Sequence, residues 1–317
     1  MQKLTVKKYQ SKDCSVWNEF VLKNKVATFL FDRDFMEYHS DRFQDFSLMI
    51  YKEDELIAIM PANIKDSVLY SHQGLTYGGL ITEMTSDTSV LIAIYEVLIA
   101  FLNQHDIKTI KIKSLPEFYD RTVNNSNKLL TDNFNATVYQ RHKVLAIDFS
   151  LPFTIHKTKL KNYRKNQSAG FMIQDDNRFD VFWNKVLIPR LKLKHNTKPV
   201  HTLEEIELLH QRFPNQIKQY NIFLNDEILA GITIFDKGNI VKSQYGATTE
   251  RGEKTRALEY LFIYLTYKFK DEGKRFFSMG TVSDKSNKLG YNPGLLRQKE
   301  ELGCQMYAQE FLLLETK

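Results

Sequence analysis

The sequence carries one short pattern twice. The run Asp54-Glu55-Leu56-Ile57-Ala58 returns later as Asp226-Glu227-Ile228-Leu229-Ala230. After each copy, a second strand-like segment leads to a tyrosine–glycine pair, Tyr77-Gly78 or Tyr245-Gly246, and then to a long amphipathic segment and a basic β-like run. Two units of hairpin, strand, helix and strand predict a duplicated α/β domain, and small-molecule sites favour the interface between such halves.

The length and composition agree with a duplication. A chain of 317 residues is long enough for about two domains. A hydrophobic content of 43% and an aromatic content of 13% are sufficient for two cores. We therefore predict an α/β (α+β) protein with tandem domains at 1–150 and 151–317, the second starting with a linker helix. Each domain is expected to be a mixed sheet flanked by helices.

Several classes of protein do not fit the sequence. The first ten residues are basic and polar without an apolar run behind them, so we expect no signal peptide. The longest apolar stretch, Val90–Leu102, is interrupted by Glu96 and is too short to span a bilayer. Two cysteines, Cys14 and Cys304, cannot form a disulfide framework, which favours a cytoplasmic protein. The spacing of histidines, cysteines and carboxylates predicts no metal site.

The net charge of +6 weakly favours anionic partners. The densest basic stretch is His156–Lys165, in which Lys157, Lys161 and Arg164 share a face at helical spacing. This face is interpreted as a solvated surface, as a phosphate-binding surface or, third, as a site for nucleic acid. We expect no nucleic-acid partner, because the chain has no RNA-binding signature.

Hydrophobic periodicity predicts the elements of the first half. The clearest helix is Thr88–Gln104, in which apolar residues recur at helical period. Shorter helices are expected at Asp13–Lys23 and Asp32–Arg42. The expected strands are Ser47–Tyr51, Leu56–Asn63, Val68–Tyr70, Thr109–Lys113, Ala136–Gln140 and Val144–Phe149.

The second half repeats this order after a basic helix within Leu151–Gly170. A long helix is expected at Lys254–Lys270, and Asn292-Pro293 is typical of an N-cap and first-turn proline. Further helices are expected at Phe179–Lys192 and Leu203–Phe213. The expected strands are Asn221–Leu224, Ile228–Phe235, Ile240–Tyr245, Arg275–Met279 and Met306–Leu314.

Two motifs link the chain to a known family. One runs from Phe35-Met36-Glu37-Tyr38-His39-Ser40-Asp41-Arg42-Phe43 through Asp45 to Ser71–Gly79; the other joins Met279–Ser283 to Asn292–Leu295, Gln298–Glu300 and Gly303. With the element order above, they resemble the GNAT acyltransferase fold, and two such units in one chain resemble the FemAB-like tandem GNAT proteins. They are most similar to a bacterial subgroup found with surface-polysaccharide (O-antigen, lipopolysaccharide) biosynthesis.

This resemblance implies a coenzyme A-dependent N-acyltransferase. Members of the subgroup modify the amino group of dTDP-linked 3-amino-3,6-dideoxy sugars, with 3-hydroxybutanoyl-coenzyme A as one donor. The sequence departs from the family where Thr249–Ala257 replaces the usual glycine-rich phosphate loop. The second half also has no long heptad run of the kind that forms the helical arm of the tRNA-dependent peptidoglycan enzymes, which argues against aminoacyl-tRNA as donor.

The chemistry needs no covalent nucleophile. A thioester and a neutral amine react directly when they are held together, so positioning and oxyanion donors can supply most of the rate. The candidate catalytic residues are His72, Asp45 and Tyr245. Alternatives stay open for each: a structural histidine for His72, an ion pair or cap for Asp45, and a core aromatic for Tyr245.

Candidate binding residues divide between the halves. Arg33 and Arg42 are candidates for nucleotide phosphates or for salt bridges with Asp32, Asp34 or Asp41. Basic side chains at a helix start, here Arg251, Lys254 and Arg256, suit a pyrophosphate. Asn292, at the start of a later helix, is equally well explained as an N-cap. The acceptor is expected to contact His39, Arg42, Ser71, Gln73 and Tyr77, and acyl-coenzyme A is expected to contact Gly246, Ala247, Arg251, Lys254, Arg256 and Asn292.

The leading hypothesis is therefore direct transfer of an acetyl or 3-hydroxyacyl group from coenzyme A to a nucleotide-linked amino sugar, in a ternary complex and without a metal. A second hypothesis is a FemAB-like acyl or aminoacyl transferase acting on a peptide, an amino acid or a peptidoglycan precursor. A third is a non-catalytic module that binds a polyanion. The oligomeric state stays open.

Overall fold

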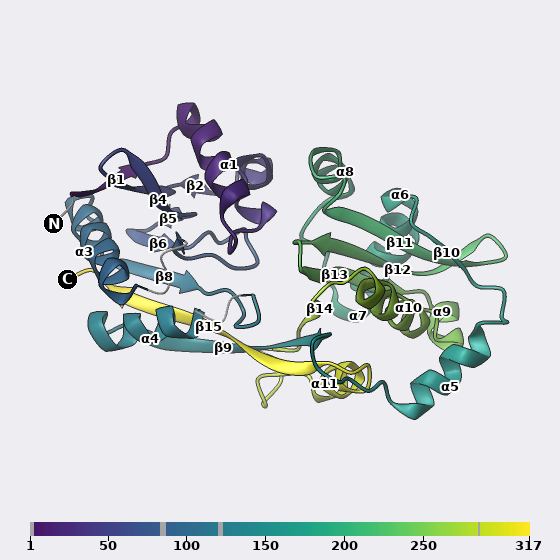
Figure 1. The fold of residues 1–317 in the computed structure, drawn as a ribbon. Helices are drawn as coiled ribbons and strands as arrows, with labels where there is room; N and C mark the ends of the chain where they lie inside the picture. Colours follow the sequence, from purple (N-terminus) through teal and green to yellow (C-terminus); the bar gives the residue numbers. More distant parts are fainter. Residues whose placement is uncertain (1–2, 83–86, 120–122, 285) are drawn as a thin grey trace. The chain divides into compact units, whose positions relative to one another are not determined.

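The computed structural model describes residues 3–82, 87–119, 123–284 and 286–317 (Figure 1). The chain forms two compact units: unit 1 is Met1–His142 with Tyr307–Lys317, and unit 2 is Lys143–Met306. Two strands, β9 (Thr137–Asp148) and β15 (Gln305–Glu315), contribute residues to both. The predicted division after residue 150 differs at the C-terminus, because Phe311–Glu315 pair with a strand of unit 1.

Unit 1 contains one antiparallel sheet of four short strands, in the order β1-β3-β4-β7. The hairpin between β3 and β4 turns at Glu53, whose φ of 55° lies in the left-handed region that such turns use. The strands are β1 (Leu4–Lys8), β3 (Leu48–Lys52), β4 (Glu55–Met60) and β7 (Ile81–Thr82).

The remaining strands of unit 1 lie in the order β15-β8-β6-β5-β2. Pro61 interrupts the long strand predicted at Leu56–Asn63, so that β5 is separate from β4. Only the β6–β8 pair is parallel, and it needs a crossover, which α3 (Thr88–Gln104) supplies. The strands are β2 (Gln44–Asp45), β5 (Asn63–Lys65), β6 (Val68–Tyr70) and β8 (Thr109–Lys113).

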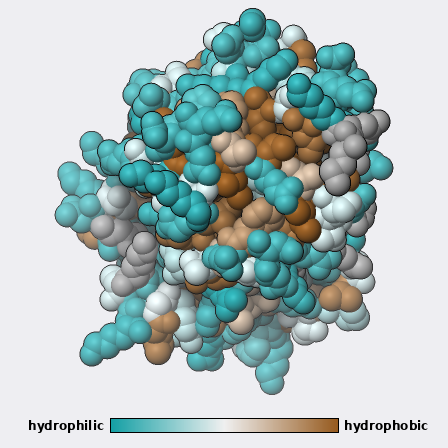
Figure 2. Space-filling view, turned by 90° about the vertical axis from the view of Figure 1, so that its left-hand side faces the viewer, coloured by the Kyte–Doolittle hydropathy of each residue, from teal (hydrophilic) through white to brown (hydrophobic). Residues whose placement is uncertain are grey.

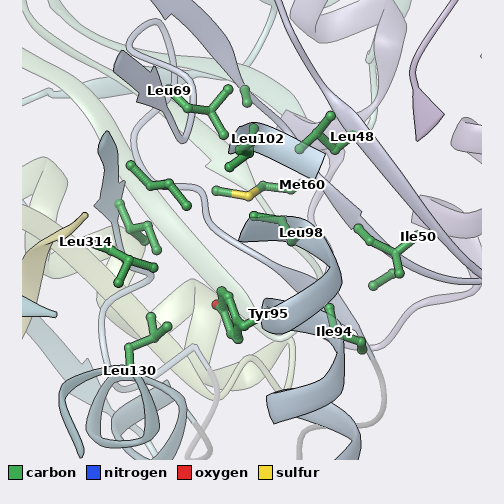
Figure 3. Close-up of a cluster of buried hydrophobic side chains, with 14 of the residues drawn as sticks. Leu48, Ile50, Met60, Leu69, Ile94, Tyr95, Leu98, Leu102, Leu130 and Leu314 are labelled. Atoms are coloured by element: carbon green, nitrogen blue, oxygen red, sulfur yellow. The ribbon is translucent and has the colours of Figure 1, made fainter. Parts of the chain in front are cut away.

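The core of unit 1 forms where α3 and α4 (Val123–Phe134) meet the strands. Leu98 and Leu102 of α3 point toward Leu48 and Met60, as Figure 3 shows, and all four are fully buried. Asp87 caps the start of α3 by accepting hydrogen bonds from two backbone N–H groups. The opposite side of α3 is less covered, and apolar residues bordered by hydrophilic ones are visible on this side of the molecule (Figure 2).

A helical segment near the N-terminus carries much of the first motif. After α1 (Cys14–Lys23), the predicted Asp32–Arg42 helix forms as α2 (Arg33–Met36) followed by a 3₁₀ turn, Glu37–His39. Asp32 is its N-cap, because its side chain accepts the backbone N–H of Asp34. The segment is therefore an irregular turn of helix rather than the continuous helix predicted.

Unit 2 contains a six-stranded sheet in the order β10-β11-β12-β13-β14-β9. The β11–β12 turn has Asn225 and Asp226 at positive φ, the combination that a two-residue hairpin turn requires. The strands are β10 (Met172–Gln174), β11 (Ile217–Leu224), β12 (Glu227–Asp236), β13 (Ile240–Thr248) and β14 (Phe276–Thr281).

The helices of unit 2 follow the predictions with two interruptions. The predicted Lys254–Lys270 helix is divided into α9 and α10 at Arg256, whose φ is 59°. The predicted Phe179–Lys192 helix contains a π segment at Trp183–Leu187. The helices are α5 (Lys157–Asn166), α6 (Phe179–Phe182), α7 (Ile188–His195), α8 (Leu203–Arg212), α9 (Glu250–Thr255), α10 (Ala257–Asp271) and α11 (Pro293–Glu300).

The two copies of the repeat differ in the strand that precedes the long helix. In unit 2, β13 is one strand that pairs with β12 along most of its length and with β14 only over Ile240–Lys242. In unit 1 the corresponding stretch is divided into β6 and β7, and residues 71–80 leave the sheet between them. Tyr77 lies in this excursion whereas Tyr245 lies in a strand, so the two tyrosine–glycine pairs occupy different structural positions.

None of the helices in the described ranges has the length and apolar character that crossing a bilayer would require.

The packing of α9 generates a stability prediction. A methyl group on buried Gly252 would overlap the Leu229 carbonyl oxygen and the Thr248 hydroxyl, whereas one on Gly294 in α11 would lie 3.4 Å from the Asn292 side chain. We expect Gly252→Ala to lower the free energy of unfolding by roughly 1–3 kcal/mol. Gly294→Ala, the control, should be neutral or slightly stabilising. Denaturant unfolding measures both, and equal effects would contradict this account.

Candidate functional site

Unit 1 contains a pocket of about 430 Å³ built largely from the first motif. Arg33, Glu37 and His39 come from the α2 segment, Asp45 from β2 and His72 from the excursion. Tyr9, at the end of β1, and Phe43 complete this part of the wall. The structure thus brings together three predicted residues, His39, Asp45 and His72, from separate segments.

Arg33 organises one side of the pocket. Its Nη2 lies 2.7 Å from Asp45 Oδ2 and 3.1 Å from Glu37 Oε1, and its guanidinium lies 3.8 Å from the centre of the Tyr9 ring. Ser47 donates a backbone hydrogen bond of 2.7 Å to Asp45 Oδ1. Burial, the largest single effect, would lower the pKa of Arg33, which is 3% exposed, but Asp45, Tyr9 and Glu37 together outweigh it and raise the pKa overall. Arg33 is therefore committed to these carboxylates and not available for a phosphate.

A stacked pair of imidazoles forms the other side. The rings of His39 and His72 lie 5.2 Å apart, and Tyr38 stacks on His39 at 4.2 Å. His39 Nδ1 is 2.6 Å from the Met36 carbonyl oxygen. His72 is 5% exposed, and its Nδ1 has no hydrogen-bond partner among the described residues. Its φ of 65° is unusual for a residue other than glycine.

The electrostatics of this pair limit its chemistry. Burial, helped by the neighbouring His39, lowers the pKa of His72 to about 3. Burial also lowers the pKa of His39. A group with so low a pKa is neutral at pH 7 and is a weak general base. This low pKa favours hydrogen bonding by His72 over general-base catalysis.

Four other predicted acceptor residues do not line this pocket. Arg42 lies 3.8 Å from Asp41, and Ser71 Oγ accepts the Lys113 backbone N–H at 2.9 Å. Gln73 exchanges two hydrogen bonds with Asn63, of 2.8 and 2.9 Å. Tyr77 is 0% exposed and its hydroxyl lies 3.1 Å from Thr28 Oγ1, as expected for a core aromatic.

Glu37 and Tyr9 are among the pocket residues that the sequence did not single out. Glu37 follows Arg33 by one helical turn, a spacing that signals an ion pair. Tyr9 comes from β1, and no local pattern could place it beside Arg33.

In unit 2, β13 and β14 diverge. They pair in parallel only over Ile240–Lys242 and Phe276–Ser278, so beyond Lys242 this edge of β13 has no strand partner among the described residues. Gly246 and Ala247, predicted to contact the donor, lie in this open stretch. Such an edge presents backbone N–H and C=O groups to a ligand, and the pantetheine arm of coenzyme A fits it chemically.

Tyr245 lies in the same stretch of β13. Its hydroxyl is 2.6 Å from His201 Nδ1 and accepts the His201 backbone N–H at 3.2 Å. Burial raises the pKa of Tyr245 to about 12, so the phenol is protonated at neutral pH. These bonds hold the hydroxyl against the loop before α8.

The start of α9 fits a pyrophosphate only in part. Arg251 pairs with Glu227, and Arg256 lies 3.8 Å from Glu259, so both predicted phosphate ligands face carboxylates. Glu250 and Glu253 occupy the first turn, and Glu253 is held by Arg190 at 2.5 Å. Lys254 has no ion pair in the described part of the chain and lines a pocket of about 370 Å³ beside this turn.

The second motif places a lysine at the end of β14. Lys299 of α11 is 9% exposed, and its Nζ donates to the carbonyl oxygens of Thr281 at 3.0 Å and Gly280 at 3.4 Å. No carboxylate pairs with it among the described residues, and burial lowers its pKa to about 8. Asn292, at the start of the same helix, caps it through the Leu295 N–H at 2.9 Å, which is the alternative expected for this residue.

Within the described ranges, no group of three or more histidine, cysteine or acidic side chains is arranged to hold a metal ion.

Comparison with known proteins identifies the fold. No protein-family model and no curated protein sequence matches the chain. Among solved structures, FemX aligns over 96% of both chains with a TM-score of 0.69 and 11% identity. L-PGS from Bacillus licheniformis aligns over 96% of this chain and 91% of its own, with a TM-score of 0.61 and 13% identity.

A tandem GNAT protein from the clavulanic acid biosynthesis pathway aligns over 99% of both chains with a TM-score of 0.52 and 10% identity. At these identities the likeness concerns the fold. It confirms the predicted fold class of two tandem GNAT-like units with mixed sheets flanked by helices.

The buried His72 generates a pH prediction. Its pKa is about 3 in the folded protein and about 6.5 when unfolded. Between these values only the unfolded chain binds the proton, so acid lowers the free energy of unfolding by roughly 1.4 kcal/mol per pH unit. Asparagine tolerates the positive φ at this position, so the His72→Asn variant should fold without this contribution of His72 to the pH dependence of stability. Between pH 6.5 and pH 5, the free energy of unfolding of the wild type should fall by about 2 kcal/mol more than that of the variant, as measured by denaturant unfolding. If the difference in stability between the two proteins stayed the same over this range, the burial argument would be contradicted.

Proposed function

We propose that this protein is an N-acyltransferase that moves an acyl or aminoacyl group from an activated donor to a primary amine. The observation that carries the proposal is the divergence of β13 from β14, which leaves an open strand edge inside a tandem GNAT-like fold. The donor arm binds along Tyr245–Ala247 in unit 2. The acceptor binds in the pocket around Arg33 and His72 in unit 1.

The donor proposed is an acyl thioester of coenzyme A, which would supply an activated carbonyl. Support comes from the open edge of β13 and from the likeness to the tandem GNAT protein, which was solved in its form without acetyl-coenzyme A. Lys254, with Arg190 and Lys194 beside it, is the proposed phosphate contact. Lys299 is proposed to hydrogen-bond the oxygen that becomes negative during transfer, because a buried ammonium without a carboxylate partner stabilises such charge.

The acceptor proposed first is the amine of an amino acid, a peptide or a peptidoglycan precursor. Two observations support it: the fold aligns best, among the structures compared above, with FemX, and it also aligns with L-PGS. The C-terminal domain of a protein named as a lysylphosphatidylglycerol synthetase, from Agrobacterium fabrum, also aligns, with a TM-score of 0.58 and 9% identity.

A dTDP-linked amino-dideoxy sugar is the second candidate acceptor. A specific observation favours it: the motif that resembles the sugar-modifying subgroup builds the pocket, through His39, Phe43 and Asp45. Neutral imidazoles and carboxylates beside an aromatic ring also suit the hydroxyl groups of a sugar.

Ligand-dependent thermal stability tests the two sites separately. A ligand that binds only the folded protein raises its stability by mass action. We expect coenzyme A, and separately an amine acceptor, to raise the unfolding temperature, with additive shifts when both are present. An RNA-dependent shift that disappears at high salt, without any response to coenzyme A, would instead favour the polyanion-binding alternative.

Transfer itself is tested through Lys299. We expect Lys299→Met to reduce turnover about a hundredfold, because it removes one donor to the developing oxyanion, while the apolar replacement keeps the buried site filled. Lys161→Met, on the exposed face of α5, is the matched control. Release of free thiol in the presence of a panel of amines gives the rate. Unchanged turnover in Lys299→Met would remove this residue from the proposed mechanism.

A further inference from the structure

We infer that the pocket of unit 1 recognises its ligand as a primary ammonium group, held between Glu37 and Asp45 beside His72. The inference rests on the proposed function for identifying this ammonium with the acceptor amine. The binding preference itself follows from the pocket.

Two carboxylates of the pocket share one guanidinium. Glu37 Oε1 and Asp45 Oδ2 both lie within hydrogen-bonding distance of the same guanidinium nitrogen of Arg33. Neither carboxylate pairs with another cation among the described residues, so one of the two negative charges has no cation of its own. Lys8 also lines the pocket, but its ammonium group lies over the Phe46 ring, 4.6 Å from the ring centre.

The Glu37 and Asp45 carboxylates can each accept a further hydrogen bond. Arg33 and the Tyr9 hydroxyl both bind Glu37 Oε1, at 3.1 and 3.3 Å, and no described residue donates to Oε2. The Glu37 side chain is 46% exposed and that of Asp45 is 32% exposed, so a ligand can reach both. Two carboxylates joined through one guanidinium are close enough to contact a single ammonium group.

His72 supplies an independent sign of a ligand. It lines the same pocket, it is 5% exposed, and its Nδ1 has no partner among the described residues. A buried polar atom without a partner costs free energy, and a bound donor removes that cost. The neutral ring adds no positive charge that would repel an ammonium group.

This charge pattern distinguishes substrate from product. When the ammonium group loses a proton and its nitrogen takes the acyl group from a thioester, free thiol leaves and the product is a neutral amide with a bulkier substituent. The unpaired negative charge then loses its partner, so the pocket favours the free amine and releases the acylated product.

Histidine-detected NMR tests the inference without any donor. The protein is labelled with ¹³C in its histidine rings, and the His72 signal is assigned with the His72→Asn variant. Three probes are titrated: D-glucosamine, L-alaninamide and N-acetyl-D-glucosamine. We expect the two amines to shift the His72 signal and the N-acetyl sugar to leave it unchanged. The relative affinity of the two amines tells a sugar source of the ammonium from an amino-acid source.

Variants locate the binding determinant. Glu37→Gln keeps an acceptor for Arg33 and Tyr9 but removes the unpaired charge, so amine affinity should fall about tenfold or more. Glu227→Gln, which removes a carboxylate paired with Arg251 in unit 2, is the control and should not change amine affinity.

The possible outcomes separate this inference from the proposed function. Equal shifts with glucosamine and N-acetylglucosamine, no shift with either amine, or an unchanged affinity in Glu37→Gln would overturn it, even if acyl transfer is observed. Amine binding that depends on Glu37 would support it, even if no acyl transfer is found with any donor.

Discussion

Both units depend on a parallel pairing that ends early. In unit 1, β6 pairs with β8 over three residues, and in unit 2, β13 pairs with β14 over three residues. A parallel pair next to a hairpin requires the long crossover helices α3 and α10, whose apolar faces form the cores. Once the pairing stops, the hairpin strand must leave its neighbour. The hairpin strand leaves its neighbour in a different way in each unit, and each candidate site includes residues from the point where it leaves.

The excursion of unit 1 carries backbone strain at the candidate site. Residues 71–80 leave the sheet, and His72 adopts a left-handed conformation that costs of order 1–3 kcal/mol outside glycine. Backbone bonds from Ser71 to Lys111 and from Gly78 to Lys113 hold the ends of the excursion to β8. Gly74 is needed because a side chain there would overlap the His39 ring. Strain, buried polar atoms and a tight glycine thus coincide at one pocket, as in functional sites generally.

Helices and strands set by local hydrophobic periodicity could be predicted from the sequence, whereas contacts between residues distant in the sequence could not. The bounds of α3 were predicted because its apolar residues recur at helical period. The helix α4 was not, because Val123–Phe134 is mostly polar. His39, Asp45 and His72 of the motif line one pocket, whereas the place of Tyr9 depends on the pairing of β1 with β3. Arg251 was expected to bind phosphate because it is basic and lies at a helix start, and its ion pair with Glu227, which is distant in sequence, could not be predicted.

The two repeats have diverged in the sign of the charge that each leaves unpaired. Unit 1 holds two carboxylates on one guanidinium, whereas unit 2 holds the buried Lys299 ammonium with only carbonyl oxygens around it. Leaving the Lys299 charge buried without a counter-charge destabilises the fold, and two carboxylates on one guanidinium repel one another, so duplication alone gives no reason to keep either. The proposed acyl transfer to an amine gives a reason for both. Its acceptor arrives as a cation and its donor carbonyl becomes an anion, so a negative site and a positive site are the two that this reaction needs.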